Sequence, residues 1–295
     1  AIDAVCNSDQ FRHSKYVALK TKDAIVDQFR ARYGRRPSVD LEDPTLRIHI
    51  HIRDQECSVA LDSSGRSLHK RGYKIASVPA PINEVLAAGI LKIAGWPIEA
   101  PFLDPMCGSG TLPLEAAMLA LRLPAQQLNP HFGFQKWPDF DAKLWGKVVE
   151  QAQERVLPKW RYPIVGRDID PLAVRAAKQN ATKLGVRQFV QFEKGDFIDG
   201  PPTDEDTVLV MNPPYDERLS IENIEYFYKC IGDQLKQHCT GSTAWIISSN
   251  FSAMKSVGLR PSRKILLYNG PLECRLFKYE MYAGTKKVHK QTSPS

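Results

Sequence analysis

The feature that most constrains the fold is a pattern that repeats along residues 101–212. A short apolar run ends in an acidic or amide side chain, and a turn or a helix-forming stretch follows; the runs are closed by Asp104, Asp168, Asp196 and Asn212. Strands that alternate with helices are typical of an open, mostly parallel sheet, which binds ligands at the carboxyl ends of its strands. We therefore expect the four side chains to meet at one edge of a Rossmann-like sheet.

The first of these strand ends leads into the turn Asp-Pro-Met-Cys-Gly-Ser-Gly-Thr at residues 104–111. Its two glycines let a ligand approach the backbone, and the start of the next helix offers free N–H groups to a carboxylate. A dinucleotide fingerprint would need glycine where Pro113 stands, and a P-loop would need a lysine before Thr111. Because Asp104 can bind a cationic amine, the turn favours an amino-acid ligand, and S-adenosylmethionine (AdoMet) is the one with a transferable methyl group.

The later strand ends supply the remaining groups that AdoMet requires. Asp168 is expected to accept hydrogen bonds from the ribose hydroxyls, whereas Asp170 is expected to cap the following helix. Asp196 can accept a hydrogen bond from the adenine amino group, with Phe197 beside the ring. The predicted cofactor-binding residues are Asp104, Pro105, Cys107, Gly108, Ser109, Gly110, Asp168, Ile169, Asp196, Phe197 and Asn212.

The sequence Asn-Pro-Pro-Tyr at residues 212–215 follows the apolar run 207–211 directly. The lone pair of an exocyclic base amine is delocalised into the ring, so acceptors must engage its hydrogens before the nitrogen can attack. The Asn212 side chain and the Pro213 carbonyl are such acceptors, and the prolines stiffen the turn. Tyr215 offers a ring face to an unstacked base. The predicted catalytic residues are therefore Asn212, Pro213, Pro214 and Tyr215.

The cysteines do not indicate a different chemistry. A C5-pyrimidine methyltransferase needs a nucleophilic thiol, but Cys107 lies inside the cofactor turn, so a packing role is favoured. The six cysteines are scattered, with no Cys-x-x-Cys pair and no histidine cluster at ligand spacing. This distribution favours reduced thiols over a disulfide framework and predicts no metal site.

These motifs resemble those of the N2-guanine RNA methyltransferases that join a THUMP RNA-binding domain to a Rossmann-like methyltransferase domain, most closely the bacterial large-subunit rRNA enzymes. The segments that carry the resemblance are 68–74, 103–111, 212–219 and 269–274. This chain departs from the family at Asp216, where members usually have glycine. The resemblance implies AdoMet-dependent methylation of a guanine N2 in 23S rRNA. The alternatives are guanine-N2 methylation of tRNA, adenine-N6 methylation, glutamine-N5 methylation of protein, and RNA binding without turnover.

The resemblance also implies the fold class: an α/β, Rossmann-like class I AdoMet-dependent methyltransferase. We expect a mostly parallel seven-stranded sheet with an antiparallel edge hairpin, preceded by a partial α+β THUMP-like RNA-binding module. Members of the family begin with a further segment of several tens of residues, so this chain is expected to be a fragment or a processed form. The expected parts are the module at 1–75, a linker and helix at 76–98, the methyltransferase domain at 99–283 with an insertion at 122–161, and a flexible tail at 284–295.

Basic residues are concentrated in the N-terminal module. The chain has a net charge of +7, and residues 1–80 hold 14 Lys and Arg against 10 Asp and Glu. If these basic residues are considered alone, a solvated charged face is slightly favoured over RNA contact. Because the chain also contains a predicted base-modifying site, phosphate contacts with RNA become the favoured interpretation. The predicted RNA-binding residues are Arg32, Arg35, Arg36, Lys70 and Arg71.

Two further segments are candidates for the edge of the site. Pro81, Asn83 and Glu84 begin an expected helix over 82–94, and an ordinary first-turn acid is an equal alternative for Glu84. In the insertion, Phe134 and Trp137 are the aromatic residues expected to reach the base pocket, although such residues more often pack within the protein.

No apolar run approaches the length of about 18 residues that spans a membrane, and the first residues do not resemble a signal peptide. We therefore expect a cytoplasmic protein that binds RNA, either rRNA or tRNA. The sequence predicts no membrane association, no metal site and no obligate protein partner.

Overall fold

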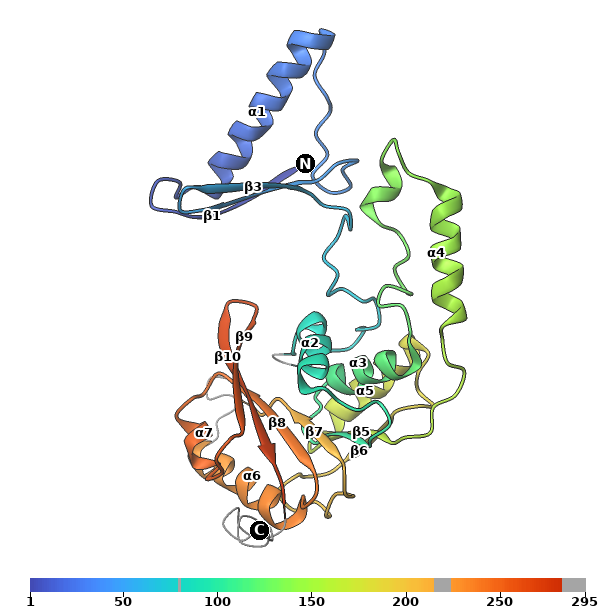
Figure 1. Ribbon diagram of the computed structural model, residues 1–295, viewed down its shortest axis with the longest axis vertical. Coiled ribbons are helices and arrows are strands. Elements are labelled where there is room, and N and C mark those ends of the chain that lie inside the picture. Colours follow the sequence, from blue (N-terminus) through green and yellow to red (C-terminus); the bar gives the residue numbers. More distant parts are fainter. Residues whose placement is uncertain (79–80, 215–223, 283–295) are drawn as a thin grey trace, which may run out of the picture. The chain divides into compact units, whose positions relative to one another are not determined.

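The computed structural model describes residues 1–78, 81–214 and 224–282. Contacts divide the chain into two compact units (Figure 1). The first unit contains Ala1–Lys70 and Asn129–Gln151, and the second contains Arg71–Leu128 and Ala152–Ser295. Residues 129–151 therefore belong to the first unit, although the segments before and after them in the chain belong to the second unit.

The first unit is built on a three-stranded sheet, β1 (Ile2–Asn7), β2 (Ile48–Arg53) and β3 (Glu56–Leu61), with helix α1 (Ser14–Tyr33) beside β1. Strand β1 pairs with β2 in parallel, and β2 and β3 form a hairpin. Ile50 and Ile52 are buried, and Val26 is the buried residue of α1. Helix α1 and the β2–β3 hairpin agree with the α+β module that was expected at residues 1–75, whereas strand β1 was not predicted.

Residues 129–151 attach to the first unit through main-chain hydrogen bonds. The N–H of Gly133 donates to the carbonyl of Ser64 (3.1 Å), and the N–H of Phe134 donates to the carbonyl of Ser63 (2.9 Å). A Cβ on Gly65 would lie 2.9 Å from the Cα of Gly133, so two glycines are needed at this crossing. The segment contains the 3-10 helix η1 (Gly133–Lys136) and the start of α4 (Ala142–Glu154).

The aromatic residues of this segment pack against one another. The ring of Phe134 lies 5.0 Å from that of Trp145, 5.5 Å from that of Phe132 and 5.9 Å from that of Phe140. Such edge and offset contacts stabilise a small core. Phe134 therefore has a packing role in the first unit.

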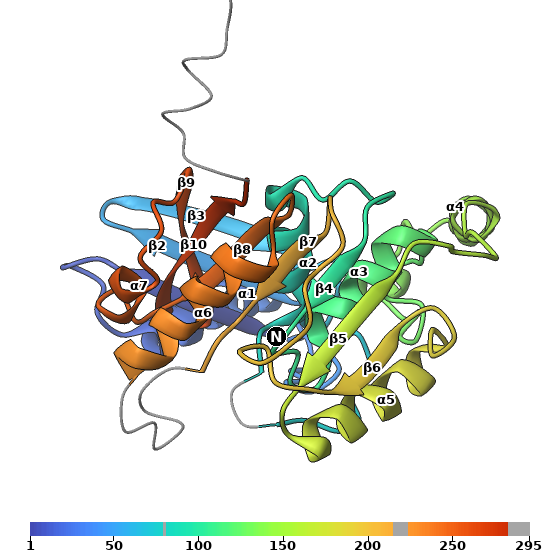
Figure 2. The same cartoon turned by 90° about the horizontal axis from the view of Figure 1, so that it is seen from below.

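The second unit contains a seven-stranded sheet of order β6-β5-β4-β7-β8-β10-β9 (Figure 2). Strands β4 to β8 pair in parallel, and β10 runs antiparallel to both of its neighbours. The expected parallel sheet with an antiparallel edge hairpin is confirmed. The strands are β4 (Phe102–Asp104), β5 (Ile164–Asp168), β6 (Gln191–Lys194), β7 (Val208–Met211), β8 (Thr243–Ser248), β9 (Arg263–Asn269) and β10 (Leu272–Glu280).

Helices cover both faces of this sheet. On one face lie α2 (Glu84–Ala94), α3 (Thr111–Leu121) and α5 (Pro171–Leu184); on the other lie α6 (Ile224–His238) and α7 (Ala253–Ser256). Val208 and Val210 pack on the face covered by α2, α3 and α5, whereas Leu209 and Met211 pack on the face covered by α6 and α7. Burial on both faces explains why β7 is a continuous apolar run.

Helix α5 shows how local sequence sets the bounds of an element. Asp170 caps its start by accepting a hydrogen bond from the N–H of Leu172 (2.8 Å), as predicted, and Pro171 occupies the first turn, where its missing N–H costs nothing. Gly185 ends the helix at a φ of 83°, a left-handed conformation that glycine adopts without strain. Among the described residues, no helix is long and apolar enough to cross a membrane.

Candidate active site

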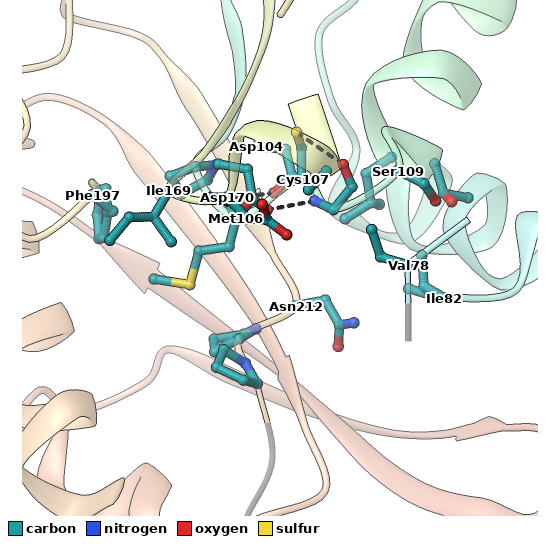
Figure 3. Close-up of a pocket in the computed structure, with 18 of the residues that line it drawn as sticks. Val78, Ile82, Asp104, Met106, Cys107, Ser109, Ile169, Asp170, Phe197 and Asn212 are labelled. Carbon is teal, nitrogen blue, oxygen red and sulfur yellow. Dashed lines mark hydrogen bonds between the residues drawn. The ribbon is translucent and has the colours of Figure 1, made fainter. Parts of the chain in front are cut away.

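The structure brings the four predicted strand-end side chains to one pocket of about 400 Å³ in the second unit (Figure 3). Asp104 ends β4, Asp168 ends β5, Asp196 lies beyond β6, and Asn212 lies directly beyond β7. Because these strands are parallel neighbours, their carboxyl ends meet at one edge of the sheet. Pro213 and Pro214 line the same pocket, and Tyr215 lies outside the described residues.

Most of the predicted cofactor-binding residues line this pocket, and Gly110 does not. Pro81 also lines it, but Asn83 and Glu84 have other positions. The side chain of Asn83 caps α2, and the carboxylate of Glu84 forms a buried ion pair with Lys74 (2.9 Å). The lining residues that were not predicted are Val78, Ile82, Met106, Thr111, Leu112, Asp170, Ala173, Gly195 and Phe227.

Close packing explains the glycines of the turn. Gly110 has a φ of 85°, and a Cβ there would lie 2.9 Å from the ring of Phe192. A Cβ on Gly166 in β5 would lie 2.6 Å from the same ring. The turn can therefore approach the sheet only because glycine stands at both positions, and the requirement at Gly166 was not predicted.

Asp168 joins two strand ends. One carboxylate oxygen accepts a hydrogen bond from the N–H of Gly108 (2.8 Å), and the other accepts one from the N–H of Asp170 (2.9 Å). A carboxylate has about four lone-pair sites, so each oxygen can still accept a further hydrogen bond. Asp168 can thus orient the glycine turn and bind a diol at the same time.

Asp104 is a buried acid with an unusual environment. Burial raises its pKa well above the usual value, a hydrogen bond from the N–H of Met106 (3.1 Å) lowers it, and the nearby charge of Asp168 raises it. In the described part of the chain, no Lys or Arg forms an ion pair with Asp104. A ligand that brings a cationic amine to this carboxyl would stabilise its charged form, as the amino-acid moiety of AdoMet would.

Two other groups of the turn fit the same ligand. The hydroxyl of Ser109 is buried, lines the pocket and has no hydrogen-bond partner among the described residues, so a polar ligand atom can satisfy it (Figure 3). Burial raises the pKa of Cys107 well above the usual value, and the charges of Asp104 and Asp168 raise it further. Cys107 therefore remains a protonated thiol, which is a poor nucleophile, and packing is its role.

A buried amide that sequence reasoning missed fastens one wall of the pocket. Asn180 of α5 accepts hydrogen bonds from the N–H groups of Ile75 (2.9 Å) and Ala76 (3.1 Å). Its amide nitrogen donates to the carbonyls of Ala76 (2.8 Å) and Ser109 (3.0 Å). Asn180 thus ties the glycine turn to residues 75–76, just before the wall residue Val78. A polar residue on the otherwise alanine-rich buried face of α5 was the signal available in the sequence.

The structure corrects the prediction that Arg71 contacts RNA. The guanidinium of Arg71 is buried and binds both carboxylate oxygens of Glu115 at 3.3 Å, and the hydroxyl of Tyr73 donates to the same carboxylate (3.1 Å). Moving the guanidinium to RNA would leave the carboxylate of Glu115 buried and unpaired, which is strongly unfavourable. The other four predicted RNA-binding residues, Arg32, Arg35, Arg36 and Lys70, are exposed on the first unit.

Known proteins share both parts of this architecture. Residues 71–278 match the family described as an RMKL-like methyltransferase domain, and residues 1–62 match the THUMP domain. The protein SMU.472, described as a methyltransferase and crystallised with SAH, superposes with a TM-score of 0.82 at 29% identity. The superposition covers 96% of this chain and 76% of SMU.472.

Two similar sequences come from Synechocystis and from Syntrophotalea carbinolica. A Synechocystis protein named as an RNA methyltransferase is 43% identical over 282 residues, which cover 95% of this chain and 73% of the relative. The ribosomal RNA large subunit methyltransferase K/L of Syntrophotalea carbinolica is 39% identical over 292 residues. That alignment covers 95% of this chain but only 41% of the relative. The chain therefore belongs to the family of AdoMet-dependent methyltransferases that join a THUMP domain to an RMKL-like methyltransferase domain.

Proposed function

We propose that this protein transfers a methyl group from AdoMet to the exocyclic N2 of a guanine in large-subunit rRNA. The observation that carries the proposal is the position of Asn212 and Pro213 in the same pocket as Asp104, Asp168 and the glycine turn (Figure 3). The K/L relatives are named for methylation of large-subunit rRNA, which supports this choice of substrate.

The chemistry requires the chain to activate an amine and to position it. AdoMet supplies an electrophilic methyl group on a sulfonium. The side-chain oxygen of Asn212 and the carbonyl of Pro213 accept hydrogen bonds from the amine, which localises the nitrogen lone pair. Met211, which precedes them, is fully buried, so β7 holds these acceptors on a rigid strand end. The amine attacks directly, loses its proton after the methyl group has transferred, and needs no covalent enzyme intermediate.

RNA binding is assigned mainly to the first unit. Its THUMP match, and the exposed Arg32, Arg35 and Arg36 at the end of α1, support a surface that binds phosphates. Phosphate contacts supply affinity without selecting the base, so the base must be selected in the pocket. The two units would then have separate tasks.

The test is to locate the methylated nucleotide by mass spectrometry. Unmodified large-subunit rRNA and unmodified tRNA transcripts are incubated separately with the enzyme and AdoMet, with Asn212→Ala as the control of lowered turnover. We expect N2-methylguanine in the rRNA. Detection of N6-methyladenine, or of a methylated tRNA, would show that the acceptor differs from the proposed one. If neither RNA is methylated, RNA binding without turnover is the function that remains.

A further inference from the structure

Near its tip, the hairpin of β9 and β10 has one face that is largely exposed, although Phe277 and Tyr279 of the same face are buried farther along β10. Cys274 and Leu276 of β10 are fully buried and point to the core beneath α2. Side chains alternate along a strand, so the opposite face carries Arg275 of β10, with Leu266 and Tyr268 of β9. Leu266 is 52% exposed and Tyr268 is 57% exposed.

This open face lies at the same edge of the sheet as the pocket. Strand β8 pairs with β10 only as far as Ser248 opposite Arg275, so the hairpin tip extends beyond the carboxyl end of β8 (Figure 1). Strands β7, β8, β10 and β9 are successive neighbours, so β10 lies about 10 Å from β7, and β9, which carries Tyr268, lies about 14 Å from it. Nucleotides on either side of a base held at Asn212 can therefore reach the hairpin.

The side chains on this face suit unpaired nucleotides. Tyr268 offers an exposed ring on which a base can stack. The guanidinium of Arg275 lies 4.3 Å from the ring centre of Phe251, which follows β8. Glu273 lies 3.7 Å from the Arg275 side chain and leaves part of the guanidinium for a phosphate. An exposed sheet face with aromatic rings and an arginine is a common platform for single-stranded RNA.

A second copy of the chain is a poorer fit to the same surface. β9 is an edge strand, and edge strands pair with other chains unless charged residues prevent it. Arg263 and Lys264 are exposed at the start of β9, and charged side chains on an edge strand oppose such pairing. The same charges attract a polyanion.

We propose that the open face of the β9–β10 hairpin, formed by Leu266, Tyr268, Arg275 and the neighbouring Phe251, binds the single-stranded nucleotides that flank the target base. This inference rests on the proposed function, because it assumes an RNA substrate at Asn212. The face makes RNA affinity depend on the second unit as well as on the arginines of the first.

The experiment compares Tyr268→Ala with Tyr268→Phe in the full chain, with an unmodified large-subunit rRNA transcript as the probe. Loss of one stacked base is expected to raise the Kd and the KM for RNA about tenfold. Tyr268→Phe keeps the ring and is expected to behave like the wild type. The kcat, the AdoMet affinity and the melting temperature should stay unchanged in both variants, because Tyr268 is exposed and does not line the pocket.

The matched control is Tyr282→Ala, an exposed tyrosine just beyond the other end of β10. It should leave RNA affinity unchanged. The inference is overturned if Tyr268→Ala binds RNA as the wild type does, or if that substitution changes only the association of the chain with itself. If the wild type binds the transcript but methylates none, the proposed function fails, and the Kd of Tyr268→Ala still decides whether the hairpin contacts RNA.

Discussion

Helices α1 and α3 represent two different ways of building a functional surface. Ten of the 11 residues of α3 are buried, whereas Val26 is the buried residue among the 20 of α1. Helix α3 begins at the glycine turn of the pocket, and α1 ends in exposed arginines. Methyl transfer needs groups held within a fraction of an ångström, which only tight packing provides; phosphate contacts depend mainly on charge.

The comparison predicts that substitutions in the two units affect different measurements. Changes in the pocket should alter turnover or cofactor affinity, with little dependence on salt. Changes at the end of α1 should alter RNA affinity and its dependence on salt, with no effect on the cofactor. Each substitution below can separate the two units more clearly or show that they are not independent.

The largest effect is expected for Asn212→Ala. Loss of a pre-aimed polar group of this kind lowers turnover by roughly 10²-fold or more. AdoMet affinity should change little, because the lost acceptor acts on the amine. Single-turnover methylation and calorimetry with AdoMet measure the two effects. Asn212→Asp keeps an acceptor oxygen and should retain more activity; methyl transfer at the wild-type rate in Asn212→Ala would contradict the assignment.

Asp168→Ala is expected to weaken AdoMet and its demethylated product together. Each hydrogen bond to a charged acceptor contributes about 1.5–3 kcal/mol at most, or about tenfold or more in Kd. The substitution also releases the N–H of Gly108, which loosens the turn. The matched control is Asp170→Ala, which loses the cap of α5 and about 0.5–2 kcal/mol of stability. If only Asp170→Ala weakens both ligands, Asp170 rather than Asp168 binds the ribose.

Asn180→Ala tests whether the wall of the pocket is positioned from a distance. It leaves the N–H of Ala76 without its acceptor, which costs about 1–3 kcal/mol of folding free energy, and removes one of the two acceptors of the Ile75 N–H. AdoMet affinity should fall several-fold although Asn180 does not line the pocket. Asn83→Ala removes the cap of α2 at about 1 kcal/mol and is the control for stability alone. Equal AdoMet affinities in the two variants would reduce Asn180 to a structural role.

The raised pKa of Asp104 predicts a dependence on pH. In the AdoMet-free protein the folded state holds this proton more tightly than the unfolded state, whose value is near 3.8. The contribution of Asp104 to stability is therefore full below that value and is lost as the pH rises through the raised pKa. Urea unfolding at several pH values should show that the wild type loses stability as the pH rises. Asp104→Asn should lose less stability over the same range. The loss that persists in this variant comes from groups such as Glu115, whose pKa is also raised by burial. Identical pH profiles for both proteins would argue against the prediction.

The sequence predicted the second unit well because its signals are local. An apolar run buried on both faces indicates β7, and Pro171 and Gly185 set the bounds of α5. The meeting of the four strand-end side chains was predicted from the same pattern, because parallel strands place their carboxyl ends at one edge of the sheet. Strand β1 was missed because its inward residues include the small Ala4 and Cys6, while Val5 is exposed.

What the sequence did not predict depends on contacts between distant segments. Asn180 can fasten the wall of the pocket only because Ser109 and residues 75–76 fold onto it. Arg71 was expected on the surface because it lies in a basic stretch, but Glu115 on α3 pairs with it in the core. Charge alone does not show whether a guanidinium faces solvent or a buried carboxylate.

The smallest effect on the pocket is expected for substitutions confined to the first unit. Arg32, Arg35 and Arg36 are exposed near the end of α1, far along the chain from the strand ends of the pocket. Their joint replacement by glutamine should weaken RNA binding and flatten its dependence on salt. Each lost phosphate contact lowers the slope of log K against log salt by about 0.7–0.9. AdoMet affinity should not change.

The control for this triple variant removes the same charge from the second unit, at the exposed Arg175, Lys183 and Lys229. Both variants lose three positive charges, so an effect of net charge alone would flatten the salt dependence equally in each. A local docking surface instead predicts a flatter slope only when the arginines of α1 are replaced. If filter binding at several salt concentrations gives the wild-type slope for that variant, these arginines are a solvated face. RNA docking must then depend on other surfaces, of which the β9–β10 hairpin is the one that the structure indicates.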